Sequence, residues 1–577
     1  MSVNPGSLTK RVYGDFRGVD FTDNNVALTR SPDSLNMYKD YKNNLGRYIK
    51  TRPTLELLKS YDNSIFGLFF YTVNNIKHLI IHSGTKLIDV VDNKETVIKN
   101  SGMNPKRSKM FVVNDNLYIL DGLNYLQYDG NEIKNVCDIA TIPKTHISMS
   151  PDGSSTESSL YQGVNLLSGL RKNCFVGDGK TKIYHLDTTD IDSDYVPIVW
   201  IDDAPLIPLT DYNYNYTDGT ITFMTAPTAP ISDGVDNIVI QYRKTIDNHK
   251  DRILKCTLFT IFDNRIFFSG NPDYPNVLFW TELNDPTYIS DLNYIKDGDS
   301  SSIKSLIAGN NALWVLKEPS QNNTAIFYHN PAGSYDALGN YEKTYPSTHS
   351  SINTGCVSEG INFNDDIVFF STRGMEGITG DITTEQILSH RSSFVDNKLL
   401  NDSKYLNLQL EEWQGYLLVI CGKNVYLADS KSKSTVNDHY EYDWFYWELD
   451  KEIICTLVHN DVLYVGTADG IYTLTDETSG VNSYWTTPYD DFGYMYYRKT
   501  TSKKGGIANI VGNEVNLYVR TDNEKFEHDK KYLVNNGYVI FKLKKKKWKQ
   551  IQLKFQSNNF GIKECSLLSY IGSYVKK

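Results

Sequence analysis

The stretch closest to a known chemical motif is FVGDGKTK, residues 175–182, which nearly matches a phosphate-binding loop. That loop needs a glycine five positions before Gly179, and Cys174 stands there instead. It must also open a helix, so that backbone N–H groups face the phosphate. The residues that follow, KIYHLD, alternate like a strand. The stretch therefore predicts a hairpin turn rather than a nucleotide site.

Two further short motifs could carry chemistry but match their templates poorly. SLTK (7–10) fits a four-residue nucleophile pattern that also occurs by chance, and Asp297–Gly298–Asp299 resembles half of a calcium loop. The residues after Asp299 do not supply the later ligands and the closing glutamate of a calcium loop, so a turn is favoured. HExxH, GxSxG and zinc-type Cys/His spacings are missing from the sequence. We therefore expect no metal, no cofactor and no enzymatic activity.

Adjacent carboxylates could serve a glycosidase, which places two acids on either side of the bond it cleaves. Neighbouring residues of a strand point to opposite faces, however, so adjacent acids do not converge. Solvation of hairpin tips is the favoured role. The pairs are Asp202–Asp203, Asp365–Asp366, Glu411–Glu412 and Asp490–Asp491.

The densest charge cluster is Lys544, Lys545, Lys546 and Lys547 in FKLKKKKWKQIQLKF, residues 541–555. Ile551, Leu553 and Phe555 alternate with polar residues after it, which indicates an edge strand preceded by a lysine-rich hairpin tip. The cluster has two interpretations, which the sequence leaves open. It is either a solvated turn that discourages edge-to-edge aggregation or a contact for an acidic partner or passing nucleic acid.

These motifs lie within a repeating unit of apolar strands. In most copies a tight Asn, Asp or Gly turn separates the first two strands and a second turn leads to a third. The seven copies occupy residues 66–91, 109–130, 258–280, 305–328, 360–379, 406–429 and 455–475. All but one of the intervals between their starts lie between 43 and 55 residues. This period is typical of a β-propeller, because ringed blades bury both faces of each sheet.

The sequence therefore predicts an all-β chain: a propeller of about seven blades with an inserted β-sandwich and a C-terminal β domain. The long interval after residue 109 marks the insertion, since strand-like runs such as VPIVWID and NIVIQY fill it. The predicted parts are an N-terminal arm or docking segment (1–60), blades (61–140), the inserted sandwich (141–248), further blades (249–480) and a basic C-terminal β domain (481–577). Within the arm, Ser31–Pro32 predicts the start of a short helix.

Composition favours a folded β protein. Hydrophobic residues make up 40% and charged residues 22%, and the 41 tyrosines favour strands. The net charge is −10, but residues 497–577 hold 18 Lys or Arg against 6 Asp or Glu, a balance of +12 that leaves −22 for the rest.

Seven scattered cysteines without a CxxC pair predict buried free thiols and folding in a reducing cytosol. The first residues lack the apolar core of a signal peptide, and no run reaches the roughly 20 apolar residues that span a membrane.

The N-terminal stretch YGDFRGVDFTDNNVALTRSPDSLNMYKDYKNNLGRYIKTRP resembles the start of phage tail nozzle or tail-hub proteins of short-tailed phages. The matching positions are Gly18, Arg30, Pro32, Asp33, Asn36, Arg52 and Pro53. Two blade phrases, IFDNRIFFSGNPDYPNVLFWTELNDPTYI and THSSINTGCVSEGINFNDDIVFFSTRGMEGITG, are similar to phrases of the same virion proteins. The resemblance extends loosely over residues 1–480.

The resemblance implies a structural protein of the virion tail, assembled in the host cytoplasm. Copies of the chain would form a cyclic ring, predicted as a hexamer, that contacts the connector or adaptor and other tail proteins. Genomic DNA would pass through it transiently and without sequence specificity, since an acidic body offers phosphates few cations. The candidate docking residues are Arg17, Arg30, Asp33, Asn36, Arg52 and Lys544 to Lys547. The alternatives are a host-surface carbohydrate binder that uses tyrosine platforms and a glycosidase that acts on surface polysaccharide.

Overall fold

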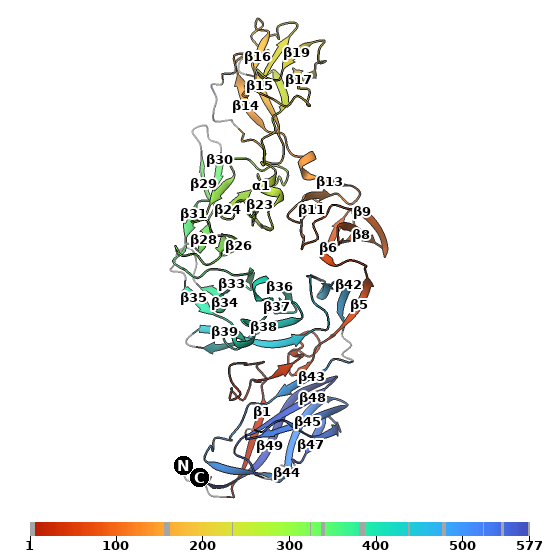
Figure 1. Cartoon of the computed structure of the whole chain (residues 1–577), viewed down its shortest axis with the longest axis vertical. Coiled ribbons are helices and arrows are strands. Elements are labelled where there is room, and N and C mark those ends of the chain that lie inside the picture. Colours follow the sequence, from red (N-terminus) through yellow and green to blue (C-terminus); the bar gives the residue numbers. More distant parts are fainter. Residues whose placement is uncertain are drawn as a thin grey trace. The chain divides into compact units, whose positions relative to one another are not determined.

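The computed structural model describes residues 6–154, 162–232, 235–322, 325–335, 341–379, 387–436, 439–475, 480–522, 524–543 and 547–574. The chain divides into two compact units, residues 1–68 with 355–577 (unit 1) and residues 69–354 (unit 2). Strands dominate both units (Figure 1). Each unit is described by itself below.

The repeat predicted from the sequence is confirmed as seven four-stranded antiparallel sheets, here called blades 1 to 7 (Figure 1). Blades 1 and 2 consist of β6 (Ile65–Val73), β7 (Ile76–Ser83), β8 (Lys86–Val91) and β9 (Lys94–Lys99), then β10 (Lys109–Val113), β11 (Asn116–Leu120), β12 (Tyr125–Tyr128) and β13 (Ile133–Asn135). Blades 3 and 4 consist of β22 (Leu258–Phe262), β23 (Arg265–Ser269), β24 (Val277–Trp280) and β25 (Tyr294–Lys296), then β26 (Ile303–Gly309), β27 (Ala312–Lys317), β28 (Ile326–His329) and β31 (Ser347–His349).

The remaining three blades belong to unit 1. Blade 5 consists of β32 (Gly360–Phe363), β33 (Asp366–Ser371), β34 (Gly374–Thr379) and β35 (Ile387–His390). Blade 6 consists of β36 (Gln409–Trp413), β37 (Tyr416–Cys421), β38 (Asn424–Val436) and β39 (His439–Glu448). Blade 7 consists of β40 (Cys455–His459), β41 (Val462–Gly466), β42 (Gly470–Thr475) and β5 (Thr54–Ser60). The β-propeller prediction is thus confirmed by strand pairing. Blade 7 takes its fourth strand, β5, from the N-terminal region, where β5 pairs antiparallel with β42.

The turns between the first and second strands explain why Asn and Asp recur in the repeat. In blade 7 both Asn460 and Asp461 have positive φ, 50° and 62°, as a two-residue type I′ turn requires. Such φ values are costly for most residues and least so for Gly, Asn and Asp. The equivalent two-residue tips of the other blades are Asn74–Asn75, Asn114–Asp115, Asp263–Asn264, Asn310–Asn311, Asn364–Asp365 and Gln414–Gly415.

The insertion between blades 2 and 3 is a β-sandwich of two sheets, as the sequence predicts. One sheet holds β14 (Lys144–Met149), β15 (Leu170–Phe175), β21 (Ile238–Arg243), β17 (Ile198–Ile201) and β18 (Ala204–Pro205). The other holds β16 (Ile183–His185), β20 (Thr220–Phe223) and β19 (Tyr212–Asn215). Alternating residues such as Tyr184, Val199 and Ile240 are fully buried and form its own core.

The C-terminal domain is a second sandwich, and the N-terminal segment is part of it. One sheet consists of β3 (Met37–Lys39), β4 (Ile49–Thr51), β49 (Phe560–Tyr574), β44 (Tyr497–Gly512) and β47 (Tyr538–Phe541), with β1 (Leu8–Gly14) also on β49. The other consists of β2 (Ser34–Leu35), β43 (Ser483–Thr486), β48 (Ile551–Ser557), β45 (Glu514–Thr521) and β46 (Glu527–Leu533). Tyr13, Phe16, Met37 and Ile49 are buried in its core.

Two sequence predictions about these terminal regions are wrong. The stretch after Ser31–Pro32 is not helical, because β2 and β3 pair with β43 and β4 and tertiary pairing overrides the local start signal. The strand that holds Ile551, Leu553 and Phe555 is not an edge strand either, since β48 lies between β43 and β45. Its polar face is covered: Gln552 is buried and donates to the carbonyl oxygen of Thr487.

Candidate docking and binding sites

Arg30, a predicted docking residue, lies in the interior of unit 1. Its guanidinium forms an ion pair with Asp443, and both side chains are almost completely buried. It also donates to the backbone oxygen of Arg17 (3.0 Å) and to Ser434 Oγ (2.6 Å), and it lies over the ring of Phe394, 3.5 Å from the centroid. Burial lowers the pKa of Arg30, and the carboxylate of Asp443 opposes that effect.

Asn36 and Arg52 form a second buried cluster. Arg52 Nε donates to Asn36 Oδ1 at 2.9 Å, and its other nitrogens donate to the backbone oxygens of Pro53 and Glu448. Asn36 Nδ2 donates in turn to the backbone oxygen of Asn482. Burial lowers the pKa of Arg52 to about 10. The cluster connects β39, the N-terminal segment and the loop before β43.

Gly18 allows the chain to pass close to β39. Its φ is +87°, and a Cβ at this position would lie 1.9 Å from the backbone oxygen of Trp444. The next residue uses this approach, since Val19 N donates to that same oxygen at 2.7 Å. Any side chain at residue 18 would collide with the backbone of β39.

Burial within one chain removes Arg30, Asn36 and Arg52 from the predicted docking surface, because their donors are used by partners inside unit 1. Arg17 and Asp33 remain accessible, with side chains 42% and 50% exposed. Lys547 is exposed, and Lys544, Lys545 and Lys546 lie outside the described residues. The docking role of the accessible residues stays a prediction.

Asp33 borders a hollow of about 590 Å³ in unit 1, here called the Lys398 hollow. Its walls come from the N-terminal segment, from the short helix α2 (Asp396–Leu399) with the loop after it, and from the start of β38. It is lined by Phe21, Pro32, Asp33, Asn397, Lys398, Asn401, Asp402, Ser403, Asn424 and Tyr426. Carboxylate, amide, hydroxyl, ammonium and aromatic groups therefore meet in one place.

Lys398 supplies the cation of the hollow. Its ammonium lies 3.5 Å from the ring centroid of Tyr446 and 5.1 Å from that of Phe21. Burial lowers its pKa, while the nearby carboxylates of Asp33, Glu448 and Asp402 oppose that effect. Among the described residues, this ammonium contacts these two rings and no hydrogen-bond acceptor.

Two carboxylates on the hollow are held in place by neighbours. Asp402 Oδ2 accepts from Asn424 Nδ2 at 2.7 Å and from the Tyr426 hydroxyl at 3.4 Å. Asp33 Oδ1 accepts from the Tyr484 hydroxyl at 2.8 Å. Each carboxylate retains lone pairs that a ligand hydroxyl could use.

The outer face of the C-terminal sandwich exposes apolar side chains. Val12, Ile507 and Ile540 lie in one cross-strand row over β1, β49, β44 and β47, because Val12 and Ile507 both pair with Ser566 and Ile507 pairs with Ile540. Ile540 is 66% and Ile507 41% exposed. The same face carries further exposed members, and we call the set the apolar face: Leu8, Val12, Ile507, Tyr538, Ile540 and Tyr570.

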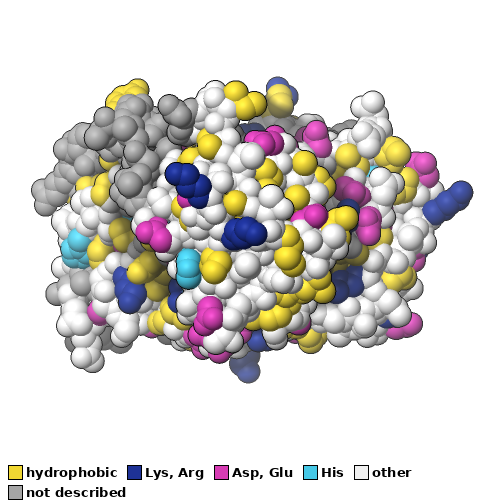
Figure 2. Space-filling model, turned by 90° about the horizontal axis from the view of Figure 1, so that it is seen from above, with side chains coloured by type: hydrophobic (Ala, Val, Ile, Leu, Met, Phe, Trp, Pro, Cys, Tyr) yellow, Lys and Arg dark blue, Asp and Glu magenta, His cyan; other side chains and the backbone are white. Residues whose placement is uncertain are grey.

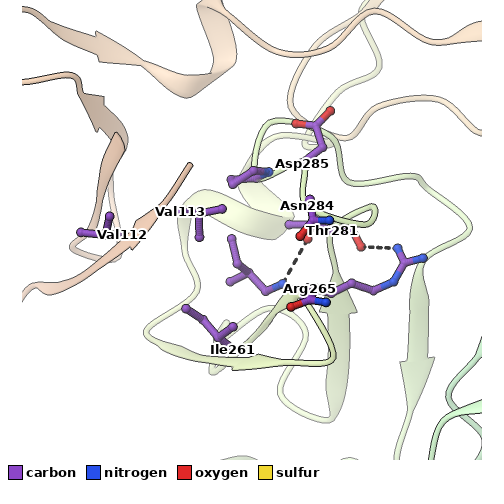
Figure 3. A pocket seen from close by; sticks show the side chains of 10 residues that line it. Val112, Val113, Ile261, Arg265, Thr281, Asn284 and Asp285 are labelled. Carbon is purple, nitrogen blue, oxygen red and sulfur yellow. Dashed lines mark hydrogen bonds between the residues drawn. The ribbon is translucent and has the colours of Figure 1, made fainter. Parts of the chain in front are cut away.

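Unit 2 has a pocket of about 210 Å³ between the hairpin tips of blades 2 and 3 (Figure 3). Val112 and Val113 form one side and Ile261 another. One guanidinium nitrogen of Arg265 donates to the backbone oxygen of Thr281 at 2.7 Å and to Glu282 Oε2 at 3.0 Å. Figure 3 shows the Arg265 guanidinium turned toward Thr281 and away from the valines. The pocket is a gap in the seam between two blades.

Comparisons with known proteins establish no family. No protein-family model and no curated protein matches the chain. Among solved structures, BamB from Moraxella catarrhalis has 11% identity and a TM-score of 0.29, over 77% of this chain and 96% of its own. The N-terminal domain of Nup159 has 9% identity and a TM-score of 0.30, over 73% and 95%. A glycoside hydrolase has 7% identity and a TM-score of 0.20, over 90% and 100%. The fold assignment rests on the strand pairing of the chain itself.

The adjacent carboxylates do not converge, as their spacing predicts, but two of them do more than solvate hairpin tips. Asp366 is buried and accepts from Arg391 Nε and the Tyr442 hydroxyl. Asp490 is buried and accepts from Arg11 and the Tyr13 hydroxyl. Asp202 and Asp203 do form a hairpin tip, with φ of 47° and 63°. These acids serve internal ion pairs and turns.

The phosphate-loop and calcium-loop candidates are both turns, but the hairpin predicted at residues 175–182 is wrong, because the strands on either side, β15 and β16, belong to different sheets. Asp178 Oδ1 accepts from the backbone nitrogens of Lys180 and Thr181, and the chain continues into the strand β16. Asp299 accepts from Lys317 Nζ at 3.0 Å, so an ammonium already occupies the space beside that carboxylate. Asp297 is fully buried and contacts His329 Nε2 at 3.0 Å.

The described residues offer few other kinds of site. No group of three or more possible metal ligands lies together among them, and no helix among them is long and apolar enough to cross a membrane. All seven cysteines are free and six are buried, as predicted for free thiols. On the face drawn in Figure 2, acidic and basic side chains are interspersed with hydrophobic ones.

Sequence reasoning missed the Lys398 hollow. Five of its ten lining residues lie in DNKLLNDS, residues 396–403, a polar stretch between blades 5 and 6 that carries no motif. Its density of Asn and Asp was the available signal, and this composition is equally typical of ordinary loops. Only tertiary contact brings Phe21 and Asp33 against this stretch, more than 350 residues away along the chain.

Proposed function

We propose that this chain is a structural subunit of the tail of a short-tailed phage, where copies form a nozzle or hub ring that conducts DNA during ejection. The resemblance of the N-terminal stretch and of two blade phrases to such proteins supports the proposal. A propeller with an inserted and a C-terminal sandwich is a β scaffold suited to an assembly subunit.

The observation that carries the proposal is the apolar face. Side chains such as Ile540, Tyr538 and Ile507 project from the outside of a sheet whose inner side already packs on a core. Contiguous exposed apolar surface on a soluble protein marks a contact surface. β47 is also the last strand of its sheet in the described chain, so its outer edge offers backbone groups to a neighbour.

The occupant of the apolar face is a neighbouring copy of the same chain. Lys10 and Lys542 are exposed; Lys10 lies within the face between Leu8 and Val12, and Lys542 directly follows β47. Lys542 belongs to the basic residues 497–577 of a chain whose remainder is strongly acidic. A basic surface on one copy facing an acidic surface on the next makes a head-to-tail contact, and such contacts close into rings. Each ring would then expose mostly acidic surface, which binds phosphates weakly.

The first experiment measures assembly of the purified chain. Multi-angle light scattering and negative-stain electron microscopy at low salt should show a closed ring. Ile507→Glu with Ile540→Glu should convert the ring to monomers, because charges buried in an apolar contact cost several kcal/mol. Ile231→Glu, at an exposed isoleucine of the inserted sandwich, is the matched control and should leave the ring intact.

The second experiment tests the tail assignment. Mass spectrometry of purified phage particles should detect the chain, and cryo-electron microscopy should place it around the exit channel. A chain that is absent from particles, or that stays monomeric at every salt and protein concentration, contradicts the proposal.

A further inference from the structure

The Lys398 hollow has the dimensions and mixture of groups of a ligand site. Its volume of about 590 Å³ lies within the usual range of ~300–1,000 Å³ for small-molecule pockets. Ammonium and amide donors, carboxylate and amide acceptors, and an aromatic side chain all line it. The apolar face that carries the proposed function is a separate surface made by different residues.

The charges around the hollow select the ligand class. Lys398 contributes one positive charge, Asp33 and Asp402 contribute two negative charges, and Lys554 adds a second ammonium, 3.6 Å from Asp33 Oδ2. Phosphates and other anions are disfavoured, because two carboxylates face them. A divalent cation is disfavoured by the ammonium groups of Lys398 and Lys554 near those carboxylates. A neutral ligand with many hydroxyl groups can satisfy both, since each hydroxyl donates to a carboxylate and accepts from an ammonium or an amide.

The fixed geometry of the lining groups favours recognition of a rigid ring. Asp402 is held by Asn424 and Tyr426, so its carboxylate is oriented before a ligand arrives. The Lys398 ammonium lies over the ring of Tyr446, a contact that favours this position of the side chain and leaves its N–H groups able to donate to a ligand. Phe21 adds an apolar surface against which the C–H groups of a pyranose can pack.

We propose that the Lys398 hollow binds one or two units of a neutral saccharide. Lys398 donates to ring hydroxyls, Asp33 and Asp402 accept from them, and Phe21 packs against the sugar ring. The exposed amides of Asn397 and Asn401 border the site; their nitrogens donate to the backbone oxygens of Phe21 and Asn397, and their Oδ1 atoms would accept from sugar hydroxyls. This site would give the chain a glycan contact that is independent of ring formation.

The test uses the full chain and four named probes: glucose, galactose, mannose and N-acetylglucosamine. Saturation-transfer difference NMR and isothermal calorimetry should detect binding of at least one of them. Lys398→Met should weaken that binding at least tenfold, because it removes the ammonium and keeps the length of the side chain. Asn401→Ala, at an exposed position, should weaken it severalfold with no change in melting temperature.

The matched control is Lys431→Met, which removes another ammonium that lies over a tyrosine, 4.4 Å from the ring centroid of Tyr41. It should leave sugar binding unchanged. The proposal is overturned if none of the four sugars binds, or if binding is the same in Lys398→Met and the parent chain. Binding of inorganic phosphate in place of the sugars would also overturn it, since the hollow would then be an anion site.

Discussion

Arg30 and Asp443 lie 413 residues apart in the sequence and form an ion pair in the interior of unit 1. Ser432 and Ser434 donate to the same carboxylate, so each of its oxygens is occupied. The pair attaches the N-terminal segment to the long hairpin of β38 and β39. The resemblance assigns Arg30 to docking, and the structure assigns it to joining distant parts of one chain.

Loss of one partner of this pair should destabilise unit 1 strongly. Arg30→Met leaves the carboxylate of Asp443 buried without its counter-charge, which costs about 3–5 kcal/mol. The double variant Arg30→Met with Asp443→Asn should recover part of that loss, because no charge is then buried alone. Urea unfolding followed by tryptophan fluorescence measures both. Equal stability of the single variant and the parent chain would contradict the assignment.

Removal of residues 1–60 should prevent folding of unit 1. The truncation deletes the fourth strand of blade 7 and four strands of the C-terminal sandwich, and it exposes the edge of β42. We expect insoluble or protease-sensitive protein in expression trials. Deletion of residues 1–6 is the control, because it stops before β1 and should leave soluble protein. A soluble, cooperatively folded chain lacking residues 1–60 would show that the segment is a dispensable arm.

His390 should make stability depend on pH in the alkaline range. Burial alone would lower its pKa, but Asp396 and Glu376 outweigh burial and raise the pKa to about 10. The folded state therefore favours protonated His390, whose unfolded pKa is about 6.5. Its stabilising contribution is complete below about pH 6.5 and is lost as pH rises toward about 10.

Urea midpoints measured between pH 6 and pH 10 test this dependence. His390→Gln should flatten the fall in stability over that range, because glutamine does not titrate. His185→Gln, at an exposed histidine of the inserted sandwich, is the control and should retain the slope of the parent chain. A slope unchanged in His390→Gln would contradict the prediction.

Asp429 should also make the stability of the folded chain fall as pH rises, but in the acidic range. Burial raises its pKa to about 6, above the value near 3.9 of an unfolded aspartate. The folded state therefore favours the protonated acid, and stability from this group falls as pH rises from about 4 to about 6. Asp429→Asn should remove that fall, which urea midpoints at pH 4 to 7 would detect. Tyr41 donates to Asp429 Oδ2 at 2.5 Å, and an amide oxygen can still accept that bond.

The hairpin tip of blade 7 should be sensitive to backbone conformation. Asn460→Val places a β-branched residue at a φ of 50° and should lower stability by about 1–2 kcal/mol. Asn460→Gly, which accepts that φ freely, should change stability by less than about 0.5 kcal/mol. Thermal unfolding of the two variants gives the comparison. Equal losses in both would show that the side chain, and not the backbone conformation, sets the cost.

The amino-acid sequence determined the local and repeating features. Alternating apolar residues and paired Asn, Asp or Gly turns are short-range signals, because strand faces and type I′ turns depend on a few neighbouring residues. They predicted the blades and the insertion correctly, and they excluded a helix after FVGDGKTK, but the turn there joins two sheets and does not form a hairpin. They could not show which strand completes blade 7. β5 lies about 400 residues before β42, and the residues of a strand do not specify which distant strand it pairs with.

Tertiary structure alone decided the roles of the charged residues. Arg30, Asn36 and Arg52 look like surface residues of an arm in the sequence, and burial against β38, β39 and β43 makes them interior. Lys398 and Asp33 became neighbours in one hollow for the same reason. The physical cause is that burial and charge pairing depend on which strands meet across hundreds of residues, whereas the sequence pattern reports only on residues that are close along the chain.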